Sequence, residues 1–113
     1  MTANPQKILI TGGAGYIGSV LTPLLLELGH SVTVLDTYAT GEPFLASSCA
    51  YENFTPVRGD ARDEALITEL VADADIVIPL AAMVGAPLCD LDPISAQTIN
   101  EDAIKMLLTK LRP

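Results

Sequence analysis

Short apolar runs alternate with longer amphipathic segments along this chain, and the two patterns predict different elements. Four β-branched or leucine-containing runs predict strands, at Lys7–Thr11, Ser31–Asp36, Phe54–Gly59 and Asp75–Leu80. Segments with helical spacing predict helices over 15–28, 60–72 and 92–111. Pro56 indicates that the third strand lies at an edge, and residues 37–53 and 81–91 predict loops, the first with room for one helical turn. This alternation predicts an α/β fold with a parallel sheet and right-handed crossovers.

The helical segments carry signals for packing and for their ends. The first helix should turn one apolar face to the sheet, made of Ile17, Val20, Leu21, Leu24, Leu25 and Leu28. Gly29 should end this helix, and Pro23 conflicts with it. Asp60 is expected to cap the second helix, and Asp92 and Pro93 to begin the third.

Composition limits the class of protein and of partner. The chain has 113 residues, 50% hydrophobic and 18% charged, which allows one domain with a core and excludes a disordered acidic tail. Its net charge is −8, and its basic residues are scattered: Lys7, Arg58, Arg62, Lys105, Lys110 and Arg112. We therefore expect neither a nucleic acid nor an anionic membrane as partner. A nucleotide remains compatible, because backbone N–H groups at a helix start can hold a pyrophosphate.

Metal binding, disulfides and cellular compartment can be judged from the cysteines, the single histidine and the N-terminal segment. Cys49 and Cys89 lack CxxC spacing, and His30 is the one histidine, so the sequence predicts no zinc site and no disulfide framework. Two inert thiols fit a reducing compartment. Residues 1–7 lack the apolar core of a signal peptide, and no run approaches the ~20 apolar residues of a membrane span. We expect a cytoplasmic protein.

The most informative stretch is TGGAGYIG, from Thr11 to Gly18, which joins a predicted strand to a predicted helix. In that context the glycines are typical of a dinucleotide-binding turn. Gly12 should permit the tight turn, Gly15 should let a pyrophosphate approach the backbone, and Gly18 should let the helix pack closely on the sheet. The helix start would offer N–H donors to the phosphates. The alternative is a glycine turn without a ligand, whereas a P-loop is excluded because no Gly-Lys-Ser/Thr follows.

Further candidate ligand residues follow the other three strands. Asp36 ends the second strand, where an acid can bind the adenosine ribose hydroxyls. Its carboxylate would repel a 2′-phosphate and no Arg occurs in 37–40, which favours NAD over NADP. Asp60 is expected to contact adenine as well as to cap, and the small residues of Leu80-Ala81-Ala82 would let a cofactor lie against the backbone. The simpler interpretations are that Asp36 is a solvated acid, that Asp60 only caps the helix, and that residues 80–82 only pack closely.

Together these features predict a Rossmann-type doubly wound parallel sheet, incomplete at four strands in the order 3-2-1-4. They also resemble the extended short-chain dehydrogenase/reductase family of nucleotide-sugar epimerases and dehydratases, over Lys7 to Arg112. The resemblance rests on the glycine loop, Asp36, Gly59-Asp60, Leu80-Ala81-Ala82 and the segment Val84 to Leu108. The cofactor residues that it implies are Gly12, Gly15, Tyr16, Ile17, Gly18, Asp36, Asp60, Ala61, Leu80, Ala81 and Ala82.

The resemblance assigns these residues to parts of NAD: the loop glycines, Tyr16 and Ile17 to the pyrophosphate, Asp36 to the ribose, Asp60 and Ala61 to adenine, and residues 80–82 to the nicotinamide side. Pro79 departs from the family, which often has His there, with little expected effect on cofactor binding.

The family's catalytic pair is missing from this chain. The family uses a Ser or Thr and a Tyr-x-x-x-Lys pair for acid–base chemistry, and none of Tyr16, Tyr38 and Tyr51 has Lys four residues later. We therefore expect the N-terminal NAD-binding portion of an enzyme that transfers hydride between a sugar carbon and NAD. The full-length enzyme would act on a nucleotide sugar as a homodimer. This chain alone should be inactive and poorly soluble, with an unprotected edge on its fourth strand.

Further functional classes remain open. The parent protein could be a reductase or hydroxysteroid-type dehydrogenase of the same family, or a non-catalytic dinucleotide sensor. The chain could also be an apolar module that binds a protein.

Overall fold

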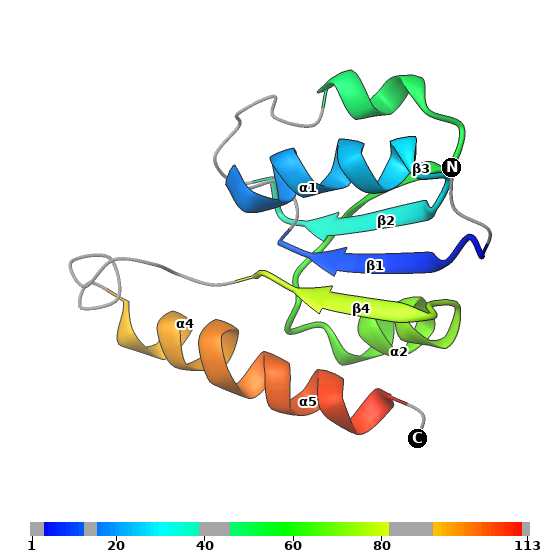
Figure 1. Cartoon of the computed structure of the whole chain (residues 1–113). Coiled ribbons are helices and arrows are strands. Elements are labelled where there is room, and N and C mark those ends of the chain that lie inside the picture. Colours follow the sequence, from blue (N-terminus) through cyan, green and yellow to red (C-terminus); the bar gives the residue numbers. More distant parts are fainter. Residues whose placement is uncertain (1–3, 13–15, 39–45, 82–91, 112–113) are drawn as a thin grey trace.

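Four parallel strands form one sheet in the computed structural model, which describes residues 4–12, 16–38, 46–81 and 92–111. The strands are β1 (Lys7–Thr11), β2 (Ser31–Asp36), β3 (Phe54–Arg58) and β4 (Ile76–Pro79). Their order across the sheet is β3-β2-β1-β4 (Figure 1). The predicted α/β fold and strand order are confirmed, and Pro56 lies on an edge strand, as predicted.

Helices cover both faces of this sheet (Figure 1). One face carries α1 (Tyr16–Glu27) and η1 (Ala46–Ala50), a 3₁₀ helix that matches the helical turn allowed by the sequence. The other face carries α2 (Glu64–Ala72) and a long C-terminal helix. That helix consists of α4 (Pro93–Gln97), the π-helical turn η2 (Thr98–Asp102) and α5 (Ala103–Lys110). None of the helices described is long and apolar enough to cross a membrane.

Two apolar clusters join these layers, because successive strand residues point to opposite faces of a sheet. The cluster under α1 contains Ile8, Ile10, Leu26, Val32, Val34 and Phe54. The cluster on the opposite face contains Leu9, Leu35, Ile67, Val71 and Leu107. Leu107 lies on α5, so the C-terminal helix is anchored to the same core as β1 and β2.

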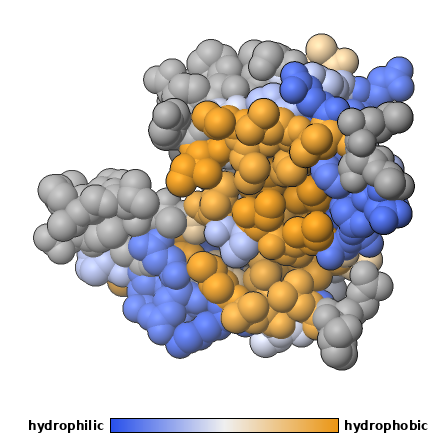
Figure 2. Space-filling model, in the orientation of Figure 1, coloured by the Kyte–Doolittle hydropathy of each residue, from blue (hydrophilic) through white to orange (hydrophobic). Residues whose placement is uncertain are grey.

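The structure corrects the predicted inward face of α1. Ile17, Val20, Leu24 and Leu28 are 64%, 51%, 54% and 47% exposed, whereas Leu21, Leu25 and Leu26 pack on the sheet. The prediction was wrong for the first four because this helix is apolar around most of its circumference, so spacing alone does not identify the side that meets the sheet. We call these four residues, three in α1 and Leu28 directly after it, the α1 stripe, and Figure 2 shows a broad apolar surface in this region.

The beginnings of two helices also differ from the sequence-based expectation. The N-cap of α2 is Asp63, whose carboxylate accepts a hydrogen bond from Leu66 N at 3.2 Å. The prediction that Asp60 caps this helix is therefore wrong, because the chain makes one further turn first, in which Asp63 N donates to Asp60 O at 3.0 Å. Pro93 begins the C-terminal helix as predicted, but hydrophobic spacing gave no sign of the π-helical turn in it.

The outer edge of β4 has no neighbouring strand among the described residues, which confirms its predicted edge position. Leu80 N donates to Thr11 O on β1 at 2.7 Å. Because adjacent residues of a strand direct their N–H groups to opposite sides, the nitrogen of Pro79 lies on the outer edge. Pro79 has no N–H, so the outer edge of β4 offers one hydrogen-bond donor fewer than the predicted unprotected strand would have.

Candidate functional site: the carboxyl edge of the sheet

Hydrogen bonds beyond the ends of the strands hold the carboxyl edge of the sheet together. Gly12 N donates to Leu35 O at 2.7 Å, and Gly59 N donates to Asp36 O at 3.0 Å. With the bond from Leu80 to Thr11, each of the four strand ends is tied to its neighbour. The predicted site residues that follow β1, β2, β3 and β4 are thereby brought to one edge, where open parallel sheets bind their ligands.

Gly12 occupies a position that no other residue can fill without distortion. Its φ is +75°, in the left-handed region that favours glycine. A Cβ added to Gly12 would lie 2.4 Å from Ala81 N and 2.5 Å from Ala81 Cα. The turn after β1 therefore lies directly against the backbone after β4, and the absence of a side chain at Gly12 permits this close approach.

Asp36 ends β2, and its carboxylate organises the following turn. Its Oδ1 accepts a hydrogen bond from Tyr38 N at 2.8 Å, where Tyr38 has a φ of 57°. The Tyr38 side chain folds back, with its hydroxyl donating to Val34 O at 3.5 Å. Burial, and then the negative charge of Asp36, raise the pKa of the Tyr38 phenol. The Asp36 carboxylate is thus held at the carboxyl edge, half-buried, at the predicted ribose position.

Three hydrogen bonds join Asp60 and Arg62 at this edge. Arg62 Nε donates to Asp60 Oδ1 at 2.9 Å and Arg62 Nη2 donates to Asp60 Oδ2 at 2.5 Å. The backbone N of Arg62 also donates to Asp60 Oδ1, at 2.8 Å. The hydrogen bond from the Arg62 side chain lowers the pKa of the Asp60 carboxyl, and the same bond raises the pKa of Arg62. Asp60 is thus an ionised carboxylate that Arg62 holds in one orientation.

Arg62 also reaches the C-terminal helix. Its Nη1 donates to Thr98 Oγ1 at 3.1 Å, at the first residue of η2. The negative charge of Asp92, before α4, further raises the pKa of Arg62. Arg62 is absent from the predicted site residues, and only its spacing two residues after Asp60 could have drawn attention to it.

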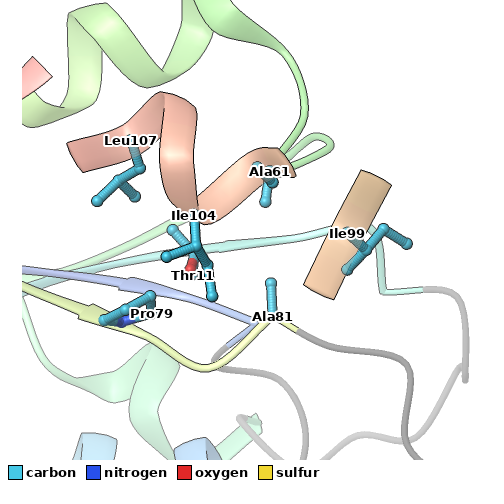
Figure 3. A pocket seen from close by; sticks show the side chains of 8 residues that line it. Thr11, Ala61, Pro79, Ala81, Ile99, Ile104 and Leu107 are labelled. Atoms are coloured by element: carbon cyan, nitrogen blue, oxygen red, sulfur yellow. The ribbon is translucent and has the colours of Figure 1, made fainter. Parts of the chain in front are cut away.

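A small apolar recess lies between the strand ends and the C-terminal helix (Figure 3). Its lining residues are Thr11, Ala61, Pro79, Ala81, Ile99, Ala103, Ile104 and Leu107. Two of them, Ala61 and Ala81, belong to the predicted cofactor site. A second depression lies at the opposite, amino edge of the sheet, where Lys7, Ser31 and Asn53 line it. The carboxyl edge is the one at which the predicted residues gather.

The remaining predicted residues are placed as follows. Tyr16 is the first residue of α1, the side chain of Ile17 is exposed, and Gly18 is buried in the first turn of that helix. Gly15 and Ala82 lie outside the described residues.

Comparison with known proteins gives this arrangement a family. The model of the NAD dependent epimerase/dehydratase family matches residues 8–108. This chain belongs to that family. Its curated relatives include the low-salt glycan biosynthesis protein Agl12 of Haloferax volcanii, which is 45% identical over 80 residues, or 68% of this chain and 26% of Agl12.

Solved structures of similar fold agree with the assignment. WbmH of Bordetella bronchiseptica, determined in complex with NAD+, is 32% identical and has a TM-score of 0.81, with 95% of this chain and 35% of WbmH covered. UDP-N-acetylglucosamine 4-epimerase from Methanobrevibacter ruminantium, in complex with UDP-N-acetylmuramic acid, is 28% identical with a TM-score of 0.84, covering 95% of this chain and 34% of the epimerase. This member of the epimerase/dehydratase family thus spans about a third of the length of these two proteins.

Proposed function

We propose that this chain is the NAD-binding portion of an NAD-dependent nucleotide-sugar epimerase or dehydratase. The observation that carries the proposal is the carboxyl edge of the sheet, where Gly12, Asp36 and Asp60 lie on adjoining strand ends. Family membership supports the same assignment. Two relatives support the ligand classes, since WbmH was solved with NAD+ and the Methanobrevibacter epimerase with a UDP-sugar.

The described residues fit one end of a dinucleotide. Gly12 lets the chain turn sharply after β1 and lie against the backbone of Ala81, and this turn would direct a pyrophosphate to the start of α1. Gly15, Tyr16, Ile17 and Gly18 would complete this phosphate site with backbone N–H groups. Asp36 would accept hydrogen bonds from the adenosine ribose, and its negative charge would disfavour the 2′-phosphate of NADP.

The segment after β3 fits the adenine base. Asp60 supplies an ionised acceptor, and the neighbouring N–H of Ala61 donates to no other described residue. An acceptor beside a donor is the complement of the adenine edge, which presents the N6 amino group beside the N1 acceptor. The small residues Leu80, Ala81 and Ala82 would face the nicotinamide half of the cofactor.

NAD would supply the hydride acceptor for a sugar carbon, and the residues of this chain would bind and orient it. The sequence has no Tyr-x-x-x-Lys pair to move a proton at the substrate. We therefore infer that this chain alone does not turn over a nucleotide sugar, and that the complete enzyme supplies the acid–base pair and the sugar site from residues outside this chain.

We also propose that these residues form the N-terminal part of a larger Rossmann domain. The outer edge of β4 and the α1 stripe support this, because together they expose strand backbone and apolar surface that a further strand and helix would cover (Figure 2). A strand paired with β4 would lack one hydrogen bond at Pro79. On the C-terminal helix, the exposed Ile94, Leu108 and Leu111 supply apolar surface for a homodimer of the complete enzyme. The exposed reduced thiol of Cys49 suits a cytoplasmic location.

Titration calorimetry with NAD and NADP tests the proposed cofactor site. The unsubstituted chain should bind NAD at least about tenfold more tightly than NADP, since a like-charge contact at the ribose costs ~1.4 kcal/mol or more. Asp36→Ala should weaken NAD binding and remove this preference. Asp73→Ala is the matched control, because this exposed Asp pairs with Lys7 at the opposite edge of the sheet. Absence of NAD binding by the folded chain would overturn the proposal and would favour the protein-binding module.

A further inference from the structure

The contact between Arg62 and Asp60 is built to hold the carboxylate in one orientation. Asp60 Oδ1 accepts two hydrogen bonds, from Arg62 N at 2.8 Å and from Arg62 Nε at 2.9 Å. Asp60 Oδ2 accepts one, from Arg62 Nη2 at 2.5 Å. A carboxylate oxygen has about two acceptor sites, so Oδ1 is filled and Oδ2 keeps one acceptor site for another donor.

The guanidinium that holds Asp60 is itself held from a second element. Arg62 Nη1 donates to Thr98 Oγ1 at 3.1 Å, which ties the loop after β3 to the π-helical turn of the C-terminal helix. A planar guanidinium with three nitrogens engaged has one orientation, which a flexible ammonium group would not have. The side chains of Asp60 and Arg62 are 36% and 38% exposed, so the carboxylate remains accessible to a ligand while it is fixed.

We propose that Arg62 is a positioning residue for cofactor recognition, which directs the remaining acceptor site of Asp60 toward an exocyclic amino group and so selects adenine among nucleotide bases. This inference rests on the proposed NAD site and adds to it the residue that makes the site selective. The base that it rejects is one with a carbonyl in place of the amino group. Hypoxanthine is such a base, and it would set its O6 against Asp60 and its N1–H against the N–H of Ala61.

The probe is therefore a pair of dinucleotides, NAD and nicotinamide hypoxanthine dinucleotide, titrated into the 113-residue chain by calorimetry. The unsubstituted chain should prefer NAD. Arg62→Ala should weaken NAD binding about three- to fivefold, the range for a partly exposed ion pair, with a smaller loss for the hypoxanthine analogue. The ratio of the two affinities should therefore fall toward one. Arg62→Lys keeps the charge without the planar fork, and it should lower the ratio as well.

Lys105→Ala is the matched control. It removes one exposed cation from an ion pair with Glu101 on the same C-terminal helix, a pair that involves neither Asp60 nor Arg62, and it should leave the ratio unchanged. Far-UV circular dichroism checks that each variant is folded, and if Arg62→Ala is unfolded, Arg62→Lys alone decides.

The outcomes separate the two proposals. If the unsubstituted chain binds neither dinucleotide, the proposed function fails. If it binds NAD, and the folded Arg62 variants keep its preference over the hypoxanthine analogue, the role of Arg62 is wrong while the NAD site stands. An equal loss for both dinucleotides would also overturn it, because a merely structural contribution would not distinguish the bases.

Discussion

Replacing Gly12 by Ala perturbs a position where, among the described residues, the backbone conformation and the packing of the carboxyl edge both require glycine. The φ of +75° places the new side chain in the left-handed region. Its Cβ would also lie 2.4 Å from Ala81 N, whereas ordinary contact begins at 3.4 Å, so the two strand ends must separate by 3.4 − 2.4 = 1.0 Å. The movement falls on the backbone, which cannot rotate away as a flexible side chain could.

The expected cost follows from these two effects. A residue with a Cβ in the left-handed region costs ~1–2 kcal/mol, and the hydrogen bond between Leu80 N and Thr11 O, which the separation breaks, contributes ~1 kcal/mol. The free energy of unfolding should therefore fall by ~2–3 kcal/mol. Because the displaced segment contains the predicted nicotinamide-side residues, NAD binding should weaken along with stability.

Urea unfolding followed by circular dichroism measures this cost, with Gly29→Ala as the matched control. Gly29 also has a positive φ, of 94°, but it is exposed after the end of α1. Its replacement by Ala should lower the free energy of unfolding only by the cost of a Cβ in the left-handed region, ~1–2 kcal/mol. Equal losses for the two variants, within about 0.5 kcal/mol, would refute the inference that close approach of β1 and β4 dictates Gly12.

Three further results are expected. Leu24→Glu in the α1 stripe, where the side chain is 54% exposed, should raise solubility and change the free energy of unfolding by no more than ~0.5 kcal/mol; a larger loss in urea unfolding would mean that the stripe is packed. Because Arg62 lowers the pKa of the Asp60 carboxyl below its ordinary 3.8, the stability that this pair adds should be present at pH 7 and lost as the pH falls through that lowered pKa. Urea unfolding of Arg62→Ala should accordingly differ less from the unsubstituted chain at pH 3 than at pH 7, and an unchanged difference would contradict the linkage. Incubation of this chain with NAD and a UDP-sugar should yield no epimerised product, and turnover would show that its own residues complete the chemistry.

Strand positions and the carboxyl-edge site could be predicted because local signals coincide there. The runs at β1 and β2 are bounded by glycine turns and polar residues, so their limits match the predicted ones. The glycine loop fixes one end of the site, and parallel order places Asp36 and Asp60 at the same edge. For these elements local pattern and tertiary structure agree.

The orientation of α1 and the contacts of Arg62 could not be predicted in the same way. A helix that is apolar on most sides gives the same spacing whichever side meets the sheet, so Ile17 and Leu24 gave no sign of their exposure. The hydrogen bond from Arg62 to Thr98 joins residues 36 positions apart, and its existence depends on the path of the chain between them. The cap at Asp63 was missed because Asp60 carries the same side chain three residues earlier.

The most direct test of the proposed NAD site is a titration of the ¹⁵N-labelled chain with NAD, followed by amide chemical shifts. We predict that shifts concentrate at the carboxyl edge, at Gly12, Ala61 and Ala81, while Ser31 and Asn53 at the amino edge stay unchanged. Shifts confined to the amino edge, or none at saturating NAD, would contradict the proposed site.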